Sequence, residues 1–164
     1  MNDINDLILR EATVGDILII EDYTIEETPY TVKPMDGMTE SLYESEKHPI
    51  LVLDGDKMVA FFILQTGDAV LKYGSNSHAI LLKAHSVDRQ YLKQGYGKAS
   101  IEKLPSFVSE HFPSINEIIL LVDYDNISGQ MLYMKSGFKD TKNRVKELDG
   151  YKFIYSKTLT NEIS

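Results

Sequence analysis

The chain has 164 residues, of which 43% are hydrophobic and 26% are charged, and its formal net charge at pH 7 is −8. This length and composition are typical of one globular domain, which we assign to residues 1–164. The acidic balance disfavours binding to the phosphates of nucleic acids. The absence of cysteine excludes disulfides and thiolate metal ligands, and we predict no metal site.

No apolar stretch approaches the ~20 residues that span a bilayer, so we expect no membrane segment. The N-terminal residues 1–6 are acidic and lack a positive segment followed by an apolar core, so no signal peptide is predicted. We therefore expect a cytoplasmic protein. The sequence leaves the oligomeric state open, with a homodimer as one alternative.

The first third of the chain predicts one strand and two helices. In order, we expect a strand over residues 7–12, a helix over 14–23 capped by Thr13, a loop over 26–34, and a short helix within residues 35–47 that Pro49 ends. Gly15 and the isoleucines lower the helix propensity of the first helix.

The middle of the chain predicts a hairpin, a long strand and a long helix. Residues 49–53 and 58–64 flank a turn with the Asp-Gly signal, Asp54-Gly55. Residues 78–87 form the next strand. A helix then runs from Gly95 to about His111, with a kink expected at Pro105.

The last third predicts a strand, a helix and a strand pair. The apolar run 117–122 is typical of a strand covered on both faces. Asp125 or Asn126 caps a helix over 127–136 that Gly137 ends, and strands over 138–146 and 151–159 follow. This order predicts a mixed sheet flanked by helices, an α/β fold.

The turn between the long strand and the long helix carries the pair Gly95 and Gly97. Without Cβ atoms the backbone comes close to an anion, and the first amides of the helix supply donors and a positive dipole end. Two phosphate motifs fail here. A P-loop requires glycine and Ser or Thr where Leu92 and Ala99 stand, and the dinucleotide fingerprint requires a third glycine.

Two blocks together resemble the GNAT superfamily of acyl-CoA-dependent N-acetyltransferases. They are Leu92-Lys93-Gln94-Gly95-Tyr96-Gly97 and Asn126-x-x-Gly129-x-x-Leu132-Tyr133-x-x-x-Gly137-Phe138. The resemblance is tightest over residues 79–138. It implies a mixed, mostly antiparallel sheet of six to seven strands flanked by helices, with splayed fourth and fifth strands.

The resemblance also implies roles for individual residues. Backbone groups near Ser86 and Val87 are expected to pair with the pantetheine arm of CoA, and Asn126 to contact the same arm. Tyr133 is expected to point its hydroxyl at the thioester sulfur. The pyrophosphate is expected to accept hydrogen bonds from the backbone of Gln94, Gly95, Tyr96, Gly97 and Lys98.

The implied reaction is acetyl transfer from acetyl-CoA to a primary amine. A free thiol has a pKa of about 8.5, so a tyrosine such as Tyr133 can protonate or hydrogen-bond the leaving thiolate. The attacking amine must lose a proton, for which His85 is a candidate general base. With no cysteine to carry an acyl group, we expect direct attack in a ternary complex. Residues 81–88 and 94–98 look similar to bacterial polyamine or small-amine acetyltransferases, which favours such acceptors.

Each assignment has a purely structural alternative. Tyr133 is also explained by packing on a buried helix face, Asn126 by helix capping alone, and Lys98 by a solvated first turn. His85 is also explained as a strand residue that packs in the structure without a catalytic role. Leu81 stands near the position where some family members carry a glutamate base, so the general base stays unassigned. A non-catalytic acyl-CoA-binding sensor and a protein-interaction module are the alternative functions.

Overall fold

The computed structural model describes residues 6–25, 32–148 and 150–159. The strands are β1 Ile8–Glu11, β2 Lys47–Asp54, β3 Lys57–Gln65, β4 Ala79–Val87, β5 Glu117–Asp123, β6 Lys139–Glu147 and β7 Gly150–Thr158. The α-helices are α1 Ile17–Glu21, α2 Pro34–Tyr43, α3 Tyr96–His111 and α4 Ile127–Lys135, and three short 3₁₀ helices cover Val14–Asp16, Asp68–Lys72 and Arg89–Tyr91. No helix within these described ranges combines the length and apolarity that crossing a membrane requires.

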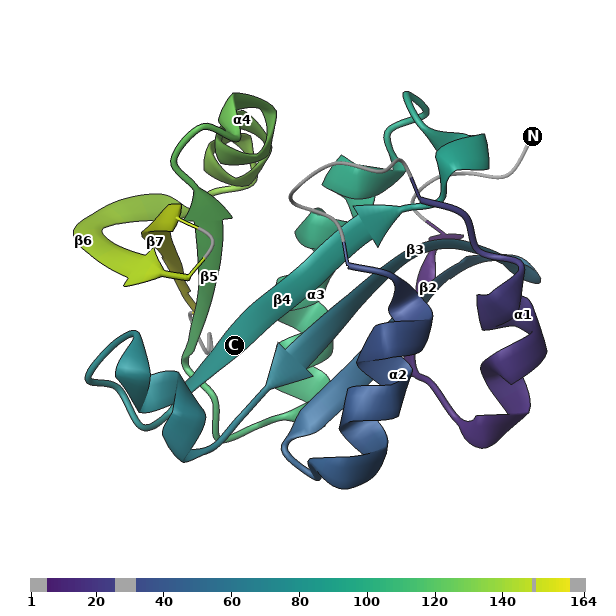
Figure 1. Cartoon of the computed structure of the whole chain (residues 1–164), viewed down its shortest axis with the longest axis horizontal. Helices are drawn as coiled ribbons and strands as arrows, with labels where there is room; N and C mark the ends of the chain where they lie inside the picture. The colour runs from purple at the N-terminus through teal and green to yellow at the C-terminus, as the bar shows by residue number, and fades with distance from the viewer. Residues whose placement is uncertain (1–5, 26–31, 149, 160–164) are drawn as a thin grey trace, which may run out of the picture.

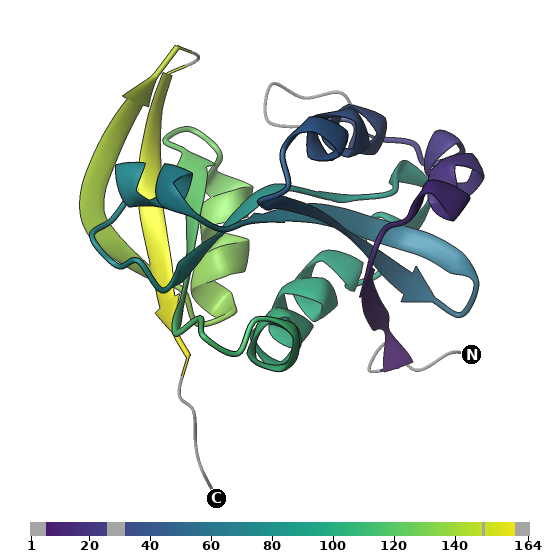
Figure 2. The ribbon, with the colours of Figure 1, turned by 90° about the horizontal axis from the view of Figure 1, so that it is seen from below.

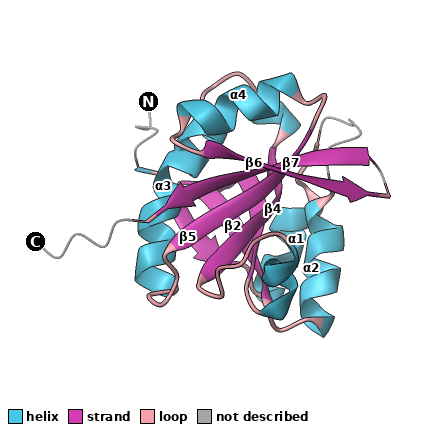
Figure 3. Ribbon diagram, turned by 90° about the vertical axis from the view of Figure 1, so that its left-hand side faces the viewer, coloured by secondary structure: helices cyan, strands magenta, loops and turns pink. Residues whose placement is uncertain are grey.

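The seven strands form one sheet in the order β1-β2-β3-β4-β5-β7-β6. Neighbouring strands are antiparallel except β4 and β5, which are parallel and are connected through α3. Figures 1 and 2 show α1 and α2 on one face of the sheet and α3 on the other, and Figure 3 shows the sheet between these two layers. The predicted α/β fold with a mixed, mostly antiparallel sheet is confirmed.

Both faces of the central strands are buried, because β3 and β4 send alternate side chains to the two layers. On the α3 face, Phe62 and Ile80 pack with Leu104 in one cluster. On the α2 face, Phe61 and Ile63 pack with Met38 in a second cluster. The two layers thus cover both faces of β4, which carries several of the predicted site residues.

The structure differs from the prediction near the N-terminus. The expected helix over 14–23 is a 3₁₀ turn followed by α1, which has only five residues. Asp16 accepts a hydrogen bond from the amide of Thr13 at 2.8 Å and makes a bidentate ion pair with Arg10 at 2.7 and 2.8 Å. This local pairing fixes a tight turn, and the isoleucines that follow are poor helix formers.

The second predicted helix forms close to the expected stretch, but Pro49 does not end it. α2 ends at Tyr43, and Pro49 lies inside β2 instead of ending the helix. The carbonyl of Pro49 accepts a hydrogen bond from the amide of Ala12 at 2.8 Å, which is the last contact between β2 and the segment of β1. Pro49 has no N–H to donate in return to the carbonyl of Ala12, so the ladder stops at this pair and β1 ends at Glu11. The predicted loop over 26–34 falls largely on residues 26–31, outside the described residues.

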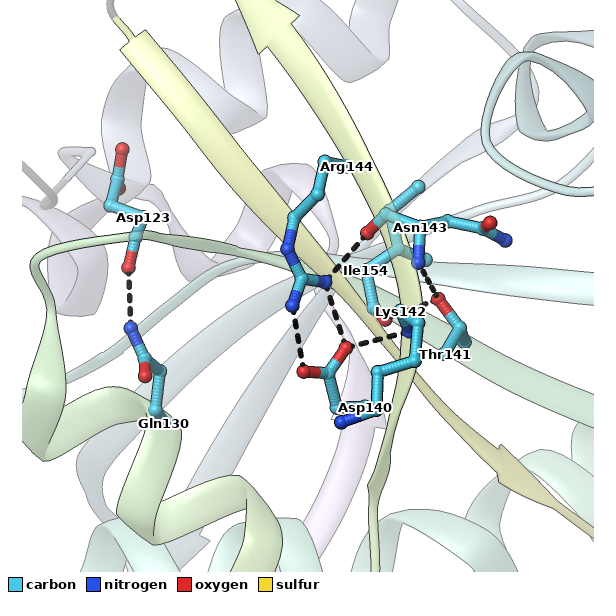
Figure 4. Close-up of polar contacts among 8 residues, drawn as sticks. All are labelled: Asp123, Gln130, Asp140, Thr141, Lys142, Asn143, Arg144 and Ile154. Carbon is cyan, nitrogen blue, oxygen red and sulfur yellow. Dashed lines mark hydrogen bonds and ion pairs between the residues drawn. The ribbon is translucent and has the colours of Figure 1, made fainter.

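The edge strand β6 contains a bulge between Asp140 and Arg144, where its pairing with β7 shifts register. Figure 4 shows the Arg144 guanidinium paired with both carboxylate oxygens of Asp140, at 2.8 and 2.9 Å. Lys142 has a φ of 70°, and Arg144 lies over the ring of Phe153 at 3.8 Å. A bulge that twists an edge strand discourages pairing with the edge of another chain.

Candidate active site

The parallel strands β4 and β5 pair over only part of their length. The last paired residues are Leu82 and Leu120, although β4 continues to Val87 and β5 to Asp123. Ala84 has a φ of 55°, and the pairing of β4 with β3 shifts register at this point, so β4 bends away from β5. Figure 1 shows the two strands diverging toward their ends, which confirms the predicted splay.

The divergence opens a cavity of about 580 Å³ between the two strands. Its lining comes from residues 82–87 of β4, residues 120–123 of β5, Leu92, Gly97, Asn126, Ser128, Gly129, Leu132 and Tyr133. Of the predicted site residues, the cavity brings together His85, Ser86, Val87, Gly97, Asn126 and Tyr133. These residues come from β4, the start of α3, and α4 with its cap, so the fold assembles positions that are distant in sequence.

The backbone of β4 alternates between its partner β3 and the cavity. The amide of Asp88 donates to Val59 on β3 at 2.8 Å. Because the N–H and C=O groups of successive residues in an antiparallel pair point to opposite sides, Val87 presents its backbone groups to the splayed side. Ser86 is directed the other way and is paired with Phe61. Val87 is therefore the better placed of the two for pairing with an extended ligand.

The start of α3 carries a run of free amides. Gly95 has a φ of 88°, the left-handed conformation that glycine adopts without strain. The first intrahelical bond runs from Ala99 N to the carbonyl of Gly95 at 3.0 Å. Among the described residues, no acceptor receives a hydrogen bond from the amides of residues 94–98. Unpaired amides at the positive end of a 16-residue helix are a ready anion site.

The side chains of this turn do not line the cavity. The Tyr96 hydroxyl donates to the buried carboxylate of Asp54 at 2.6 Å, a bond that raises the pKa of Tyr96 to about 12. Lys98 lies 3.7 Å from Glu102 along the exposed face of α3, and Gln94 is exposed. Tyr96 thus attaches the turn to the β2–β3 hairpin, and the predicted roles of Gln94, Gly95, Tyr96 and Lys98 rest on their backbone.

The segment between β4 and the turn is anchored by Asp88, which is 3% exposed. Its carboxylate accepts from the Thr24 hydroxyl at 2.7 Å and from the amide of Gln90 at 2.9 Å. The hydroxyls of Tyr23 and Ser86 lie 2.9 Å apart, and burial raises the pKa of Tyr23. These contacts fix the end of β4 against the segment after α1, and the sequence pattern did not reveal them.

Of the two predicted caps, Asp125 and Asn126, it is Asn126 that caps α4, by accepting a hydrogen bond from the amide of Gly129 at 3.1 Å. A Cβ at Gly129 would lie 2.5 Å from the Asn126 amide nitrogen, so the folded-back cap occupies the space that the alanine of the family motif would need. Gln130 donates to the carbonyls of Asp123 and Tyr124 at 3.0 and 2.9 Å, as Figure 4 shows for Asp123. The end of β5 and the first turn of α4 therefore hold each other in place.

We predict that Asn126→Ala lowers the free energy of unfolding by about 1 kcal/mol, because the cap is lost. The melting temperature should fall by about 2–4 °C for a chain of this size. Thermal unfolding followed by circular dichroism measures the change. Asn143→Ala makes the same chemical change on an exposed residue of β6; it is the control and should leave the melting temperature within about 1 °C.

Tyr133 and His85 meet inside the cavity. The Tyr133 hydroxyl lies 3.4 Å from His85 Nδ1, a long hydrogen bond of the kind that tightens in substrate complexes. On its other side, His85 Nε2 lies 2.9 Å from the hydroxyl of Ser100, a fully buried residue of α3. Burial lowers the pKa of His85 to about 4 and raises the pKa of Tyr133 to about 12. Both side chains are therefore neutral near pH 7.

This pKa predicts that no activity change between about pH 5 and pH 8 comes from His85. A histidine with an ordinary pKa of about 6.5 would make kcat change near pH 6.5, because it gains a proton as the pH falls. With its pKa near 4, His85 is already neutral at the lower end of this range. The profiles of kcat against pH for the wild type and for His85→Gln should differ in height but share one shape. A limb near pH 6.5 that only the wild type shows would contradict this assignment.

Two charged side chains, Lys83 and Asp123, also line the cavity. Lys83 lies on β4, donates to Gln65 at 3.2 Å, and has its pKa lowered by burial and by the charge of Lys47. Asp123 forms an ion pair with Lys152 at 2.9 Å. Leu81, near the position of the glutamate base of some family members, is buried in a separate apolar cluster and does not line the cavity. The proton of the amine therefore has no carboxylate acceptor at that position.

Comparison with known proteins agrees with this geometry. The uncharacterized N-acetyltransferase YbbJ of Bacillus subtilis (strain 168) is 37% identical over 122 residues, which are 74% of this chain and 76% of that protein. No family model matches the sequence. The relative and the splayed-strand fold together define the class: the chain belongs to the GNAT family of acyl-CoA-dependent N-acetyltransferases.

Solved structures share the fold at low sequence identity. The spermidine N-acetyltransferase of Vibrio cholerae in complex with CoA and spermine has a TM-score of 0.69 and 15% identity, over 93% of this chain and 95% of that chain. The aminoglycoside acetyltransferase AAC(6')-Ib with coenzyme A has a TM-score of 0.74 and 14% identity over the same shares. The ribosomal-protein-S18-alanine N-acetyltransferase of Escherichia coli has a TM-score of 0.65 and 20% identity, over 96% and 98% of the two chains.

Proposed function

We propose that the protein transfers an acetyl group from acetyl-CoA to a primary amine, with a small amine or a polyamine as the acceptor. The observation that supports this most strongly is the cavity between β4 and β5. It runs beside the open backbone of Val87, reaches the free amides at the start of α3, and contains the hydroxyl of Tyr133. A narrow slot with backbone donors, an anion site at one end and a proton donor inside suits a nucleotide thioester.

The residues present fit CoA in three ways. The open edge of β4 offers amide and carbonyl groups to the two amides of pantetheine, as one more strand would. Five amides without acceptors at residues 94–98 fit the diphosphate, and Gly97 has no Cβ to fill the space beside them. Asn126 lies on the opposite wall, at the start of α4. Bound acetyl-CoA supplies the acyl group and a thiolate leaving group.

In the proposed reaction a neutral amine nitrogen forms a bond to the thioester carbonyl carbon, and the C–S bond breaks with its electron pair on sulfur. The nitrogen loses one proton to solvent. Tyr133 donates its hydroxyl proton to the sulfur and regains one from solvent, so the products are an amide and free CoA. The chain has no cysteine to carry an acyl group, which supports attack in a ternary complex.

The acceptor assignment rests on charge and on analogy. The formal charge of −8 favours the approach of a cation. Two of the similar structures are named for amine substrates: the Vibrio cholerae enzyme is in complex with CoA and spermine, and AAC(6')-Ib is an aminoglycoside acetyltransferase. Lys83 in the cavity lining disfavours a polyamine, because its charge repels a second ammonium group close to the reacting amine. A homodimer and a cytoplasmic location stay predictions.

The direct test is an assay of CoA release with a panel of amines at a fixed concentration of acetyl-CoA. The panel contains spermidine, shorter diamines, monoamines, an aminoglycoside and a peptide with a free N-terminus. We expect release above the hydrolysis background with at least one polyamine or small amine. Release with the peptide alone would overturn the acceptor class, and no release with any amine would favour the non-catalytic sensor.

Binding of acetyl-CoA is tested separately by thermal unfolding. A ligand at 100 times its Kd adds about 2.7 kcal/mol to the free energy of unfolding, which raises the melting temperature of a domain of this size by about 5–11 °C. Adenosine at the same concentration is the control, because it lacks the diphosphate and the pantetheine arm. No shift with acetyl-CoA would favour a protein-interaction module.

A further inference from the structure

Ser100 is a polar residue in the middle of an apolar helix face. It lies on α3 one turn before Leu104, has no exposed surface, and belongs to none of the three apolar clusters. Its hydroxyl contacts two groups, the carbonyl oxygen of Gly97 at 2.8 Å and His85 Nε2 at 2.9 Å. A buried hydroxyl with two specific partners, one of them in the cavity, calls for an explanation beyond packing.

The partners of Ser100 determine where its proton lies. The carbonyl of Gly97 can only accept, so the 2.8 Å contact requires the Ser100 hydroxyl to donate to it. The hydroxyl has only one hydrogen, so toward His85 the Ser100 oxygen can only accept. His85 Nε2 must therefore carry the hydrogen of the 2.9 Å bond. In a neutral imidazole the other nitrogen then has a lone pair. That nitrogen, Nδ1, faces the Tyr133 hydroxyl.

We propose that Ser100 is a positioning residue that holds His85 as the Nε2–H tautomer, so that Nδ1 accepts from Tyr133 and keeps the tyrosine hydroxyl directed into the cavity. The tautomer follows from the hydrogen bonds alone, and only its effect on kcat rests on the proposed function. The chain of donors runs from Tyr133 through His85 and Ser100 to the Gly97 carbonyl. It connects the proton donor to the first turn of the helix whose amides fit the diphosphate.

The hydrogen bond between Tyr133 and His85 is weak, which suits a hydroxyl that is to be oriented first and then to give up its proton. At 3.4 Å the contact between Tyr133 and His85 is long, and the low basicity of the buried imidazole leaves the proton on the tyrosine. A developing thiolate is charged and is a stronger acceptor than a neutral imidazole. The hydroxyl is thus oriented before the reaction and is released to sulfur when the C–S bond breaks.

The test measures the tautomer directly. Long-range ¹H–¹⁵N correlation spectra of protein labelled at histidine show which ring nitrogen carries the hydrogen, and His85→Gln identifies the His85 signals. We expect the wild type to have Nε2 protonated and Nδ1 bare. In Ser100→Ala we expect a population with hydrogen on Nδ1, because Nε2 has lost its acceptor.

Activity supplies the second readout. Ser100→Ala should lower kcat by at least about tenfold, part of the 10²–10⁴-fold typical of general acid–base catalysis, while KM for acetyl-CoA stays within about twofold. Ser100→Thr keeps the hydroxyl and should restore both the tautomer and most of kcat. Ser41→Ala is the matched control. The Ser41 hydroxyl donates to Met38 with the same spacing and the same 2.8 Å distance, but on α2 and away from the cavity.

A wild-type spectrum with the hydrogen on Nδ1 would overturn the proposal, and so would a Ser100→Ala spectrum and kcat equal to those of the wild type. If Ser100→Ala does not fold, the wild-type spectrum and Ser100→Thr decide the question. The spectra need no substrate. An Nε2–H signal that Ser100→Ala loses therefore supports the proposal even if no amine is acetylated, a result that would count against the proposed function alone.

Discussion

Replacing Tyr133 with phenylalanine is expected to lower kcat by about 100-fold or more, with the Kd for acetyl-CoA changed by less than about twofold. The hydroxyl lies inside the cavity and is the proton donor we assign to the leaving thiolate. The ring packs against the α3-side core and is retained in phenylalanine, so the walls of the cavity keep their shape. Steady-state kinetics and titration calorimetry measure the two quantities independently.

The control for this substitution is Tyr43→Phe, which makes the same chemical change on an exposed residue of α2. It should leave kcat and Kd at wild-type values. A Tyr133→Phe enzyme with full kcat would remove Tyr133 from the reaction and leave only its packing role. Equal losses of kcat and of affinity would mean that the hydroxyl serves binding rather than the departure of the thiolate.

The second large effect is expected at Gly97. Gly97→Glu should weaken acetyl-CoA binding by at least about 100-fold, because it places a carboxylate beside the amides that we assign to the diphosphate. An added Cβ meets Val87 at 3.4 Å and Leu132 at 3.9 Å, contacts that the neighbouring side chains can accommodate. The loss should therefore come from the charge and length of glutamate, with little change in folding.

Gly97→Ala separates these contributions, since it adds the Cβ without the charge. We expect this variant to bind acetyl-CoA within about fivefold of the wild type and to gain up to about 1 kcal/mol in stability from better helix propensity. Titration calorimetry and thermal unfolding measure both quantities. If Gly97→Glu binds as tightly as Gly97→Ala, the diphosphate lies elsewhere.

Much of the fold follows from local signals. The Asp-Gly turn predicted the β2–β3 hairpin, the apolar run at Ile118 predicted the buried strand β5, and the capping residue Asn126 predicted the start of α4. Prediction was weakest where tertiary contacts override propensity. At the N-terminus the pairing of Arg10 with Asp16 determines a turn where a helix was expected.

The sequence predicts which backbone groups form the candidate site, but it does not predict the hydrogen bonds among the side chains there. The glycine turn and the Tyr133 motif are recognisable because their residues are close in sequence. The contact between His85 and Tyr133 joins residues 48 positions apart, and that between His85 and Ser100 joins residues 15 positions apart. One local signal was available, because Ser100 lies on the same helix face as Leu104. The direction of Tyr96 toward Asp54 depends on the packing of α3 against a distant hairpin.

The central claim is that the free amides at the start of α3 bind the diphosphate of acetyl-CoA. The most direct measurement is a crystal structure of the protein with acetyl-CoA. We predict diphosphate oxygens within hydrogen-bond distance of amides between residues 94 and 98, the pantetheine arm along β4 at Val87, and the thioester sulfur beside the Tyr133 hydroxyl. A diphosphate bound away from α3, with the cavity between β4 and β5 empty, would contradict the claim.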